Sequence, residues 1–155
     1  MVTIERIRPD HAEALFRALR SPEIYRHLDE PPPADANAVA RRIARWIAGP
    51  EAGAAEVWLN WAVRHEGVIV GHVQATVVGE EASLAWVFDP VVWGRGVAFA
   101  GVQAMIAALA ERGVRRLRAD TEVGNHRSRA LMARLGFAEV SRTQTEVFFA
   151  REGLT

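Results

Sequence analysis

The chain has 155 residues, of which 50% are hydrophobic and 25% charged, and its 19 basic and 19 acidic residues give a net charge of zero. This balance fits one domain that is long enough to bury a core, and it argues against a nucleic-acid-binding protein. With no cysteine, no metal-ligand spacing among the five histidines and no apolar run of export or membrane-spanning length, we expect a cytoplasmic protein without a disulfide, a metal site or a membrane partner.

The first half of the chain predicts a strand, two helices and a hairpin. Alternating polarity indicates the strands, apolar residues at helical spacing indicate the helices, and Pro or Gly marks where an element stops. A Pro-rich stretch between the helices can continue neither of them and predicts a stiff loop. In chain order these elements are a strand at 2–8, a helix from Pro9 to the stop at Ser21-Pro22, the loop at 29–33, a helix from Asp35 to Gly49-Pro50, and strands at 57–65 and 68–78 that meet in a turn at Glu66-Gly67.

The second half alternates strands and helices. Its elements are a strand at 84–88, a helix at 96–112 closed by Gly113, a strand at 117–123, a helix at 125–135 ended by Gly136, and strands at 137–141 and 145–150. The unit from 86 to 123 requires a parallel crossover. We therefore expect one α/β (α+β) domain over residues 1–155, with a mixed, mostly antiparallel seven-stranded sheet and about four helices in the order β-α-α-β-β-β-α-β-α-β-β.

The stretch Trp93-Gly94-Arg95-Gly96-Val97-Ala98 lies between a predicted strand and the long helix that follows it. Small residues let a ligand approach the backbone, and the first amides of a helix have no partner within the helix. Together with the helix dipole, these amides form an anion-binding site, and a pyrophosphate is the ligand that we expect there. A tight turn without a ligand explains the same glycines.

A second motif runs from Asn125 to Phe137. Asn125 is a good cap for the helix that follows it, and Gly136 is a good terminator. These structural interpretations account for the local geometry when the motif is considered alone.

The two motifs together resemble those of the GNAT superfamily of acyl-CoA-dependent N-acyltransferases, in particular its RimJ/RimL-like branch of ribosomal-protein acetyltransferases. The family's Gln/Arg-x-x-Gly-x-Gly/Ala turn is similar to Trp93-x-x-Gly96-x-Ala98, with Trp in place of Gln or Arg, and the segment from Pro90 resembles the branch's Pro-x-x-Trp-Gly-x-Gly form. Downstream, the family's Asn-x-x-Ser-x-x-x-x-x-x-Leu-Gly-Phe pattern is matched by Asn125, Ser128, Leu135, Gly136 and Phe137. The element order is also similar, so the resemblance covers nearly the whole chain.

The resemblance implies acetyl-CoA as the co-substrate and assigns residues to it. Backbone amides from Arg95 to Phe99 would hold the pyrophosphate, main-chain groups of Val87 and Phe88 would pair with the pantetheine arm, and Asn125 would bond to the same arm. The implied cofactor-binding residues are Val87, Phe88, Trp93, Gly94, Arg95, Gly96, Val97, Ala98, Phe99, Asn125 and Ser128.

The implied reaction is direct attack of a neutral amine on the thioester, which needs a base and an acid for the departing thiolate. Many relatives use a Tyr as the acid, but that position holds Met132, so Ser128 is the available substitute; a helix-start Ser bonded to the backbone is the alternative. For the base we prefer Glu122, which would border the cleft, to Glu81, which strand alternation can turn away. Either acid could instead be solvated, and a chain of water molecules could replace both.

The acceptor pocket is expected between the first two helices and the last hairpin. Its candidate residues are Leu28, Asp29, Glu30 and Trp86, and the acids would suit a cationic acceptor such as a peptide α-amine or an aminoglycoside. A charged surface loop explains the same acids.

The sequence thus predicts an N-acetyltransferase, monomeric or homodimeric, that acts on a peptide N-terminus or a small-molecule amine. The alternative is a non-catalytic acyl-CoA-binding module, whereas a dinucleotide-binding fold does not fit the antiparallel middle strands.

Overall fold

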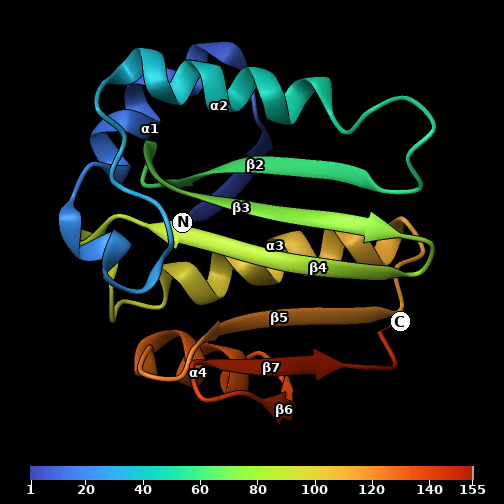
Figure 1. The fold of residues 1–155 in the computed structure, drawn as a ribbon. Helices are drawn as coiled ribbons and strands as arrows, with labels where there is room; N and C mark the ends of the chain where they lie inside the picture. Colours follow the sequence, from blue (N-terminus) through green and yellow to red (C-terminus); the bar gives the residue numbers. More distant parts are fainter. Residues whose placement is uncertain (155) are drawn as a thin grey trace.

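The computed structural model describes residues 1–154, whose seven strands form one sheet in the order β1-β2-β3-β4-β5-β7-β6 (Figure 1). Only β4 and β5 pair in parallel; every other pair of neighbours is antiparallel. The strands are β1 (Val2–Arg6), β2 (Val57–His65), β3 (Val68–Val78), β4 (Glu81–Phe88), β5 (Arg116–Glu122), β6 (Ala138–Arg142) and β7 (Glu146–Arg151). The predicted mixed, mostly antiparallel sheet with one parallel crossover is confirmed.

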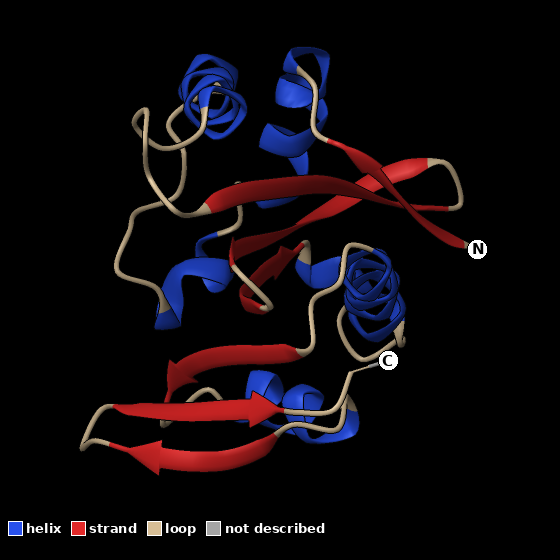
Figure 2. Cartoon of the chain, turned by 90° about the vertical axis from the view of Figure 1, so that its right-hand side faces the viewer, coloured by secondary structure: helices blue, strands red, loops and turns tan. Residues whose placement is uncertain are grey.

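The described part of the chain forms four α-helices and three short 3-10 helices, which cover the sheet. Figure 2 shows α1 and α2 on one side of strands β1 to β4 and α3 on the other side. The helices are α1 (Ala12–Leu19), α2 (Ala36–Ala48), α3 (Val97–Glu111) and α4 (His126–Arg134), with the 3-10 helices η1 (Pro9–His11), η2 (Pro22–His27) and η3 (Pro90–Val92). The order of strands and α-helices is the predicted one. No helix within residues 1–154 combines the length and the apolar character needed to cross a membrane.

Pro and Gly shape the ends of these elements, though not always as stops. α1 ends at Leu19, before Ser21-Pro22 as expected. Pro22 itself begins η2, because its fixed φ suits the first helical position and its missing N–H is not needed there. Asp35 caps α2 as expected, since its carboxylate accepts a hydrogen bond from the Ala38 amide at 2.8 Å. β4 begins at Glu81, three residues before the predicted start at 84, because it pairs with β3 directly after the turn.

The core lies on both faces of the sheet. The predicted inner face of α3 packs fully against the strands through Val102, Met105, Ile106 and Leu109. On the other face, α1 and α2 meet the sheet through residues such as Leu15 and Ile43. Ile47 was expected on the same buried stripe but is 52% exposed. Ile47 lies in the last turn of α2. With 13 residues, α2 is longer than the eight-residue α1 beside it, so α1 does not cover this last turn.

The sheet divides between β4 and β5. These strands pair only where residues 81–83 face residues 116–118. Beyond that point they separate, and Figure 2 shows β5, β7 and β6 diverging from the other strands. The second halves of β4 and β5 therefore each present an edge that no strand covers.

Candidate active site

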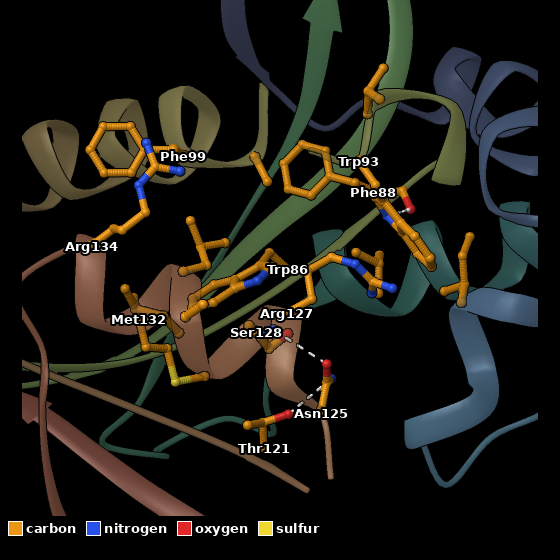
Figure 3. Close-up of a pocket in the computed structure, with 18 of the residues that line it drawn as sticks. Trp86, Phe88, Trp93, Phe99, Thr121, Asn125, Arg127, Ser128, Met132 and Arg134 are labelled. Atoms are coloured by element: carbon orange, nitrogen blue, oxygen red, sulfur yellow. Dashed lines mark hydrogen bonds between the residues drawn. The ribbon is translucent and has the colours of Figure 1, made fainter. Parts of the chain in front are cut away.

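A cavity of about 350 Å³ occupies the space where β4 and β5 diverge (Figure 3). Its wall is built from η2, β4, the turn before α3, the first turn of α3, the end of β5 and α4. The lining residues include Leu28, Trp86, Val87, Phe88, Trp93, Gly94, Gly96, Ala98, Phe99, Asp120, Thr121, Asn125, Arg127, Ser128, Met132 and Arg134. Most of the residues expected to bind the cofactor are thus brought together.

The start of α3 forms one end of this wall. Gly94 and Gly96 have φ angles of +74° and +79°, a left-handed conformation that glycine adopts without strain. The first helical bond is donated by the Ala100 amide to the Gly96 carbonyl. The amides of residues 97–99 consequently have no main-chain acceptor in the described chain, and they are available to an anion. The side chain of Arg95 is exposed and that of Val97 is in the core, so neither lines the cavity.

The uncovered edge of β4 forms the long side of the cavity. The Asp89 amide donates to the Val70 carbonyl at 2.8 Å. Because main-chain groups alternate sides along a strand, those of Val87 also point toward β3, whereas those of Trp86 and Phe88 face the open edge. Val87 therefore contributes only its side chain to the cavity. The main-chain groups expected from Val87 at the open edge come instead from Trp86. The sequence could not reveal this because the register against β3 decides it.

Two aromatic side chains on the α3 side of the cavity are covered by arginines from α4. Trp93 donates from its indole nitrogen to the Phe88 carbonyl at 3.0 Å, and the guanidinium of Arg127 lies 3.4 Å from its ring centroid. Arg134 lies 4.6 Å from the ring of Phe99 in the same way (Figure 3). Both contacts join α4 to the α3 side, and they place two positive charges beside the unpartnered amides.

Asn125 caps α4, as the structural interpretation of this motif predicts. Its side-chain Oδ1 accepts a hydrogen bond from the Ser128 amide at 3.3 Å, and its side-chain nitrogen donates to Thr121 Oγ1 at 3.1 Å (Figure 3). Ser128 lines the cavity, and its hydroxyl forms no hydrogen bond within residues 1–154. Met132, where the family resemblance leads one to expect a Tyr, is 2% exposed and packs into the core.

The two candidate bases lie at opposite ends of the β4–β5 pair. Glu122 ends β5, and its Oε1 is 2.9 Å from Nδ1 of His27, the last residue of η2. Glu81 begins β4, far along the strand from Phe88, and contacts Arg118 and Arg116 at 2.9 and 3.6 Å. The structure does not bring Glu81 to the cavity, because the cavity lies beside the other end of the strand.

Carboxylates gather on the β5 side of the opening. Asp120 lines the cavity, and Glu146 stands opposite Glu122 in the β5–β7 register. Burial, together with the negative charges of Asp120, Glu122 and Asp29, raises the pKa of Glu146. No motif in the sequence points to Asp120 or Glu146, since only the strand register places them together.

The predicted acceptor residues are divided between the cavity and the surface. Leu28 and Trp86 line the cavity, and Asp29 lies close enough to raise the pKa of Glu146. Glu30 instead faces Arg42 of α2, at 3.9 Å. Within residues 1–154, no three His, Asp or Glu side chains are placed to hold a metal ion.

Comparison with known proteins gives one family and many similar folds. The family model described as an acetyltransferase (GNAT) domain matches residues 2–138. No curated protein sequence matches the chain significantly. A crystal structure of a GNAT-family acetyltransferase from Bacillus anthracis has a TM-score of 0.80 at 17% identity, covering 97% of this chain and 94% of that one.

Two further solved structures have the same fold. The structure of RimL, a ribosomal L7/L12 alpha-N-protein acetyltransferase in complex with coenzyme A, has a TM-score of 0.84 at 17% identity and covers 97% of this chain and 93% of that one. An acetyltransferase from Thermus thermophilus has a TM-score of 0.77 at 21% identity, with 98% and 97% of the two chains covered.

Proposed function

Because the chain belongs to the GNAT family of acetyltransferases, we propose that it transfers the acetyl group of acetyl-CoA to a primary amine by direct attack in a ternary complex. The observation that carries this proposal is the uncovered edge of β4. This edge joins the unpartnered amides of α3 to the part of the cavity that Ser128 lines. An acyl-CoA has the matching chemistry, with a pyrophosphate at one end, an arm that carries amides, and a thioester at the other end.

The residues around the cavity fit such a molecule. The amides of residues 97–99 suit a pyrophosphate, and the guanidinium groups of Arg127 and Arg134 would add paired donors for phosphate oxygens. The main chain of Trp86 and the amide of Phe88 are free to pair with the pantetheine arm as an added strand would. The Phe88 carbonyl is already used by Trp93.

The chemistry requires little more than proton transfer and positioning. A carbon–nitrogen bond forms as the carbon–sulfur bond breaks, the amine nitrogen loses one proton, and the thiolate gains one. Ser128 is the acid we propose for the thiolate, since its hydroxyl is otherwise unbonded in the described chain. Glu122, the last residue of β5, is the candidate base for the amine proton.

We propose that the acceptor is cationic in solution. Asp120, Glu122, Glu146 and Asp29 give one side of the opening a negative potential, which attracts an ammonium group. The similar RimL structure is that of an enzyme that acetylates a protein α-amine. A peptide N-terminus is therefore the first acceptor to test, followed by lysine peptides, polyamines and aminoglycosides.

The test is release of free thiol from acetyl-CoA in the presence of each class of amine. We expect one class to give turnover well above the rate without an amine. If calorimetry shows that acetyl-CoA binds while every amine class leaves the rate unchanged, the proposed transfer is wrong. The chain would then act as a non-catalytic acyl-CoA-binding module, a role compatible with Met132 in the Tyr position.

A further inference from the structure

A side-chain hydrogen bond joins η2 to the end of β5, next to residues that line the cavity. His27 Nδ1 and Glu122 Oε1 lie 2.9 Å apart, although 95 positions separate the two residues in the sequence. Their side chains are 28% and 38% exposed, so the contact is neither buried in the core nor fully solvated. The imidazole is thus partly accessible from solvent.

The neighbours of both residues line the cavity. Leu28 follows His27 directly, and Thr121 precedes Glu122. The imidazole also lies against the turn between β5 and α4, since a methyl group built on Gly124 would be 3.8 Å from His27 Cε1. That turn leads into Asn125, whose side chain holds the amide of Ser128. His27 therefore lies against the turn that leads into α4, the helix that carries the proposed acid.

The hydrogen bond determines which nitrogen of His27 can accept a proton. A carboxylate only accepts hydrogen bonds, so Glu122 holds His27 in the tautomer with the proton on Nδ1. Nε2 then carries a lone pair, and it has no hydrogen-bond partner within residues 1–154. A carboxylate that orients an imidazole, with the second nitrogen free, is the arrangement used for general-base catalysis.

We propose that His27 is the general base of the acetyl transfer and that Glu122 is a positioning residue that acts through it. This inference rests on the proposed function and changes the role of Glu122 within it. As the neutral amine attacks the thioester carbon, His27 Nε2 takes one proton from the nitrogen. The departing thiolate takes one proton from Ser128, which regains it from the imidazolium by way of solvent. The products are the amide and free CoA, and no other reactant is needed.

The experiment compares three variants with the wild-type protein, using the amine that gives turnover in the thiol-release assay. His27→Asn keeps a donor near the position of Nδ1 but has no basic nitrogen, so we expect kcat to fall by about 100-fold or more with little change in acetyl-CoA affinity. Glu122→Gln keeps an acceptor for Nδ1, so we expect a smaller loss of kcat. His65→Asn, at the far end of β2, is the matched control and should keep wild-type turnover.

A second readout separates catalysis from structure. We expect added imidazole to restore part of the turnover of His27→Ala and to leave Ser128→Ala unchanged, because only the first variant lacks a base. If His27→Asn keeps more than half of the wild-type kcat, His27 is not the base. A lost rate that imidazole does not restore, in a variant that unfolds earlier than wild type, would assign His27 a structural role. Wild-type inactivity toward every amine would overturn the proposed function and this inference with it, before any variant is compared.

Discussion

His72 is a buried ionisable side chain that the proposed chemistry does not use. Its ring stacks on Trp46 with centroids 4.2 Å apart, and its Nε2 lies 2.9 Å from Asn60 Oδ1. Burial lowers the pKa of His72 to about 3. The folded protein therefore keeps this histidine neutral where the unfolded chain, with an ordinary pKa near 6.5, takes up a proton. The free energy of unfolding should fall as the pH drops below about 6.5, by at most about 1.4 kcal/mol per pH unit.

His72→Gln tests this pH dependence. Glutamine keeps a donor for Asn60 but cannot charge, so the variant should be less stable than wild type near neutral pH and lose less stability on acidification. Urea unfolding between about pH 7 and 5 measures the difference, because most carboxylates stay ionised in that range. His65→Gln, at a partly exposed site, should keep the wild-type slope. Parallel pH profiles for wild type and His72→Gln would contradict the prediction.

Ser128 can be tested through kinetics alone. If its hydroxyl protonates the thiolate, Ser128→Ala should lower kcat by at least about 10-fold and leave acetyl-CoA affinity nearly unchanged. The Asn125 cap uses the amide of residue 128 and not its hydroxyl, so the helix start should persist in the variant. Ser141→Ala, on the exposed strand β6, is the matched control. Equal kcat values for the variant and wild type would remove Ser128 from the mechanism.

At this residue scale the sequence predicted positions that belong to motifs. It placed Gly96 and Asn125 at the starts of α3 and α4, where turn and cap chemistry restricts which residues can stand. The role of Ser128 rests on the family resemblance and stays a prediction. His27 has no motif around it, and only the fold brings it to Glu122.

The end of β4 is held in place by close packing against β3. Gly71 of β3 faces Phe88, and a Cβ atom at position 71 would lie 2.5 Å from Phe88 Cδ1 and 2.7 Å from the Val87 carbonyl. Gly71→Ala must therefore shift the part of β4 that forms the cavity wall. We expect a loss of about 1–3 kcal/mol in unfolding free energy, together with weaker acetyl-CoA binding.

A double-mutant cycle identifies the cause of that loss. Phe88→Leu removes the ring that the new methyl group would meet, so Gly71→Ala should cost less in the Phe88→Leu background than in wild type. Urea unfolding gives the four free energies, and calorimetry follows acetyl-CoA affinity. Strictly additive free energies would show that the ring is not the obstacle.

The sequence predicted which α-helices and strands form and in what order. It did not predict their exact ends or how far neighbouring strands pair. The spacing of apolar residues predicted α3 and its buried face, because a helix needs the same spacing whichever element it packs against. The short β4–β5 pairing could not be predicted, since the number of paired residues depends on how far two strands stay together in space. The same limit applies to η2, where a Pro begins a helical turn or ends one according to the chain around it.

The whole molecule places opposite charges on the two sides of one opening. Arg127 and Arg134 stand near the start of α3, and Asp120 and Glu146 stand on the β5–β7 side. This separation suits two substrates of opposite charge that meet in the middle, with phosphates on one side and an ammonium group on the other. The formal net charge of zero conceals this division, so composition alone could not predict it.

One cavity shared by both substrates has a kinetic consequence. If the amine attacks acetyl-CoA directly, both must be bound before any product leaves, and initial rates with both concentrations varied should give intersecting double-reciprocal lines. The chain has no cysteine to carry the acetyl group as a thioester, and the lining residues come from both halves of the divided sheet at one site. Parallel lines, together with thiol released in a burst before the amine is added, would indicate an acetylated enzyme. The wall of the cavity would then hold a nucleophile, and Ser128 would be the first residue to examine for a covalent acetyl group.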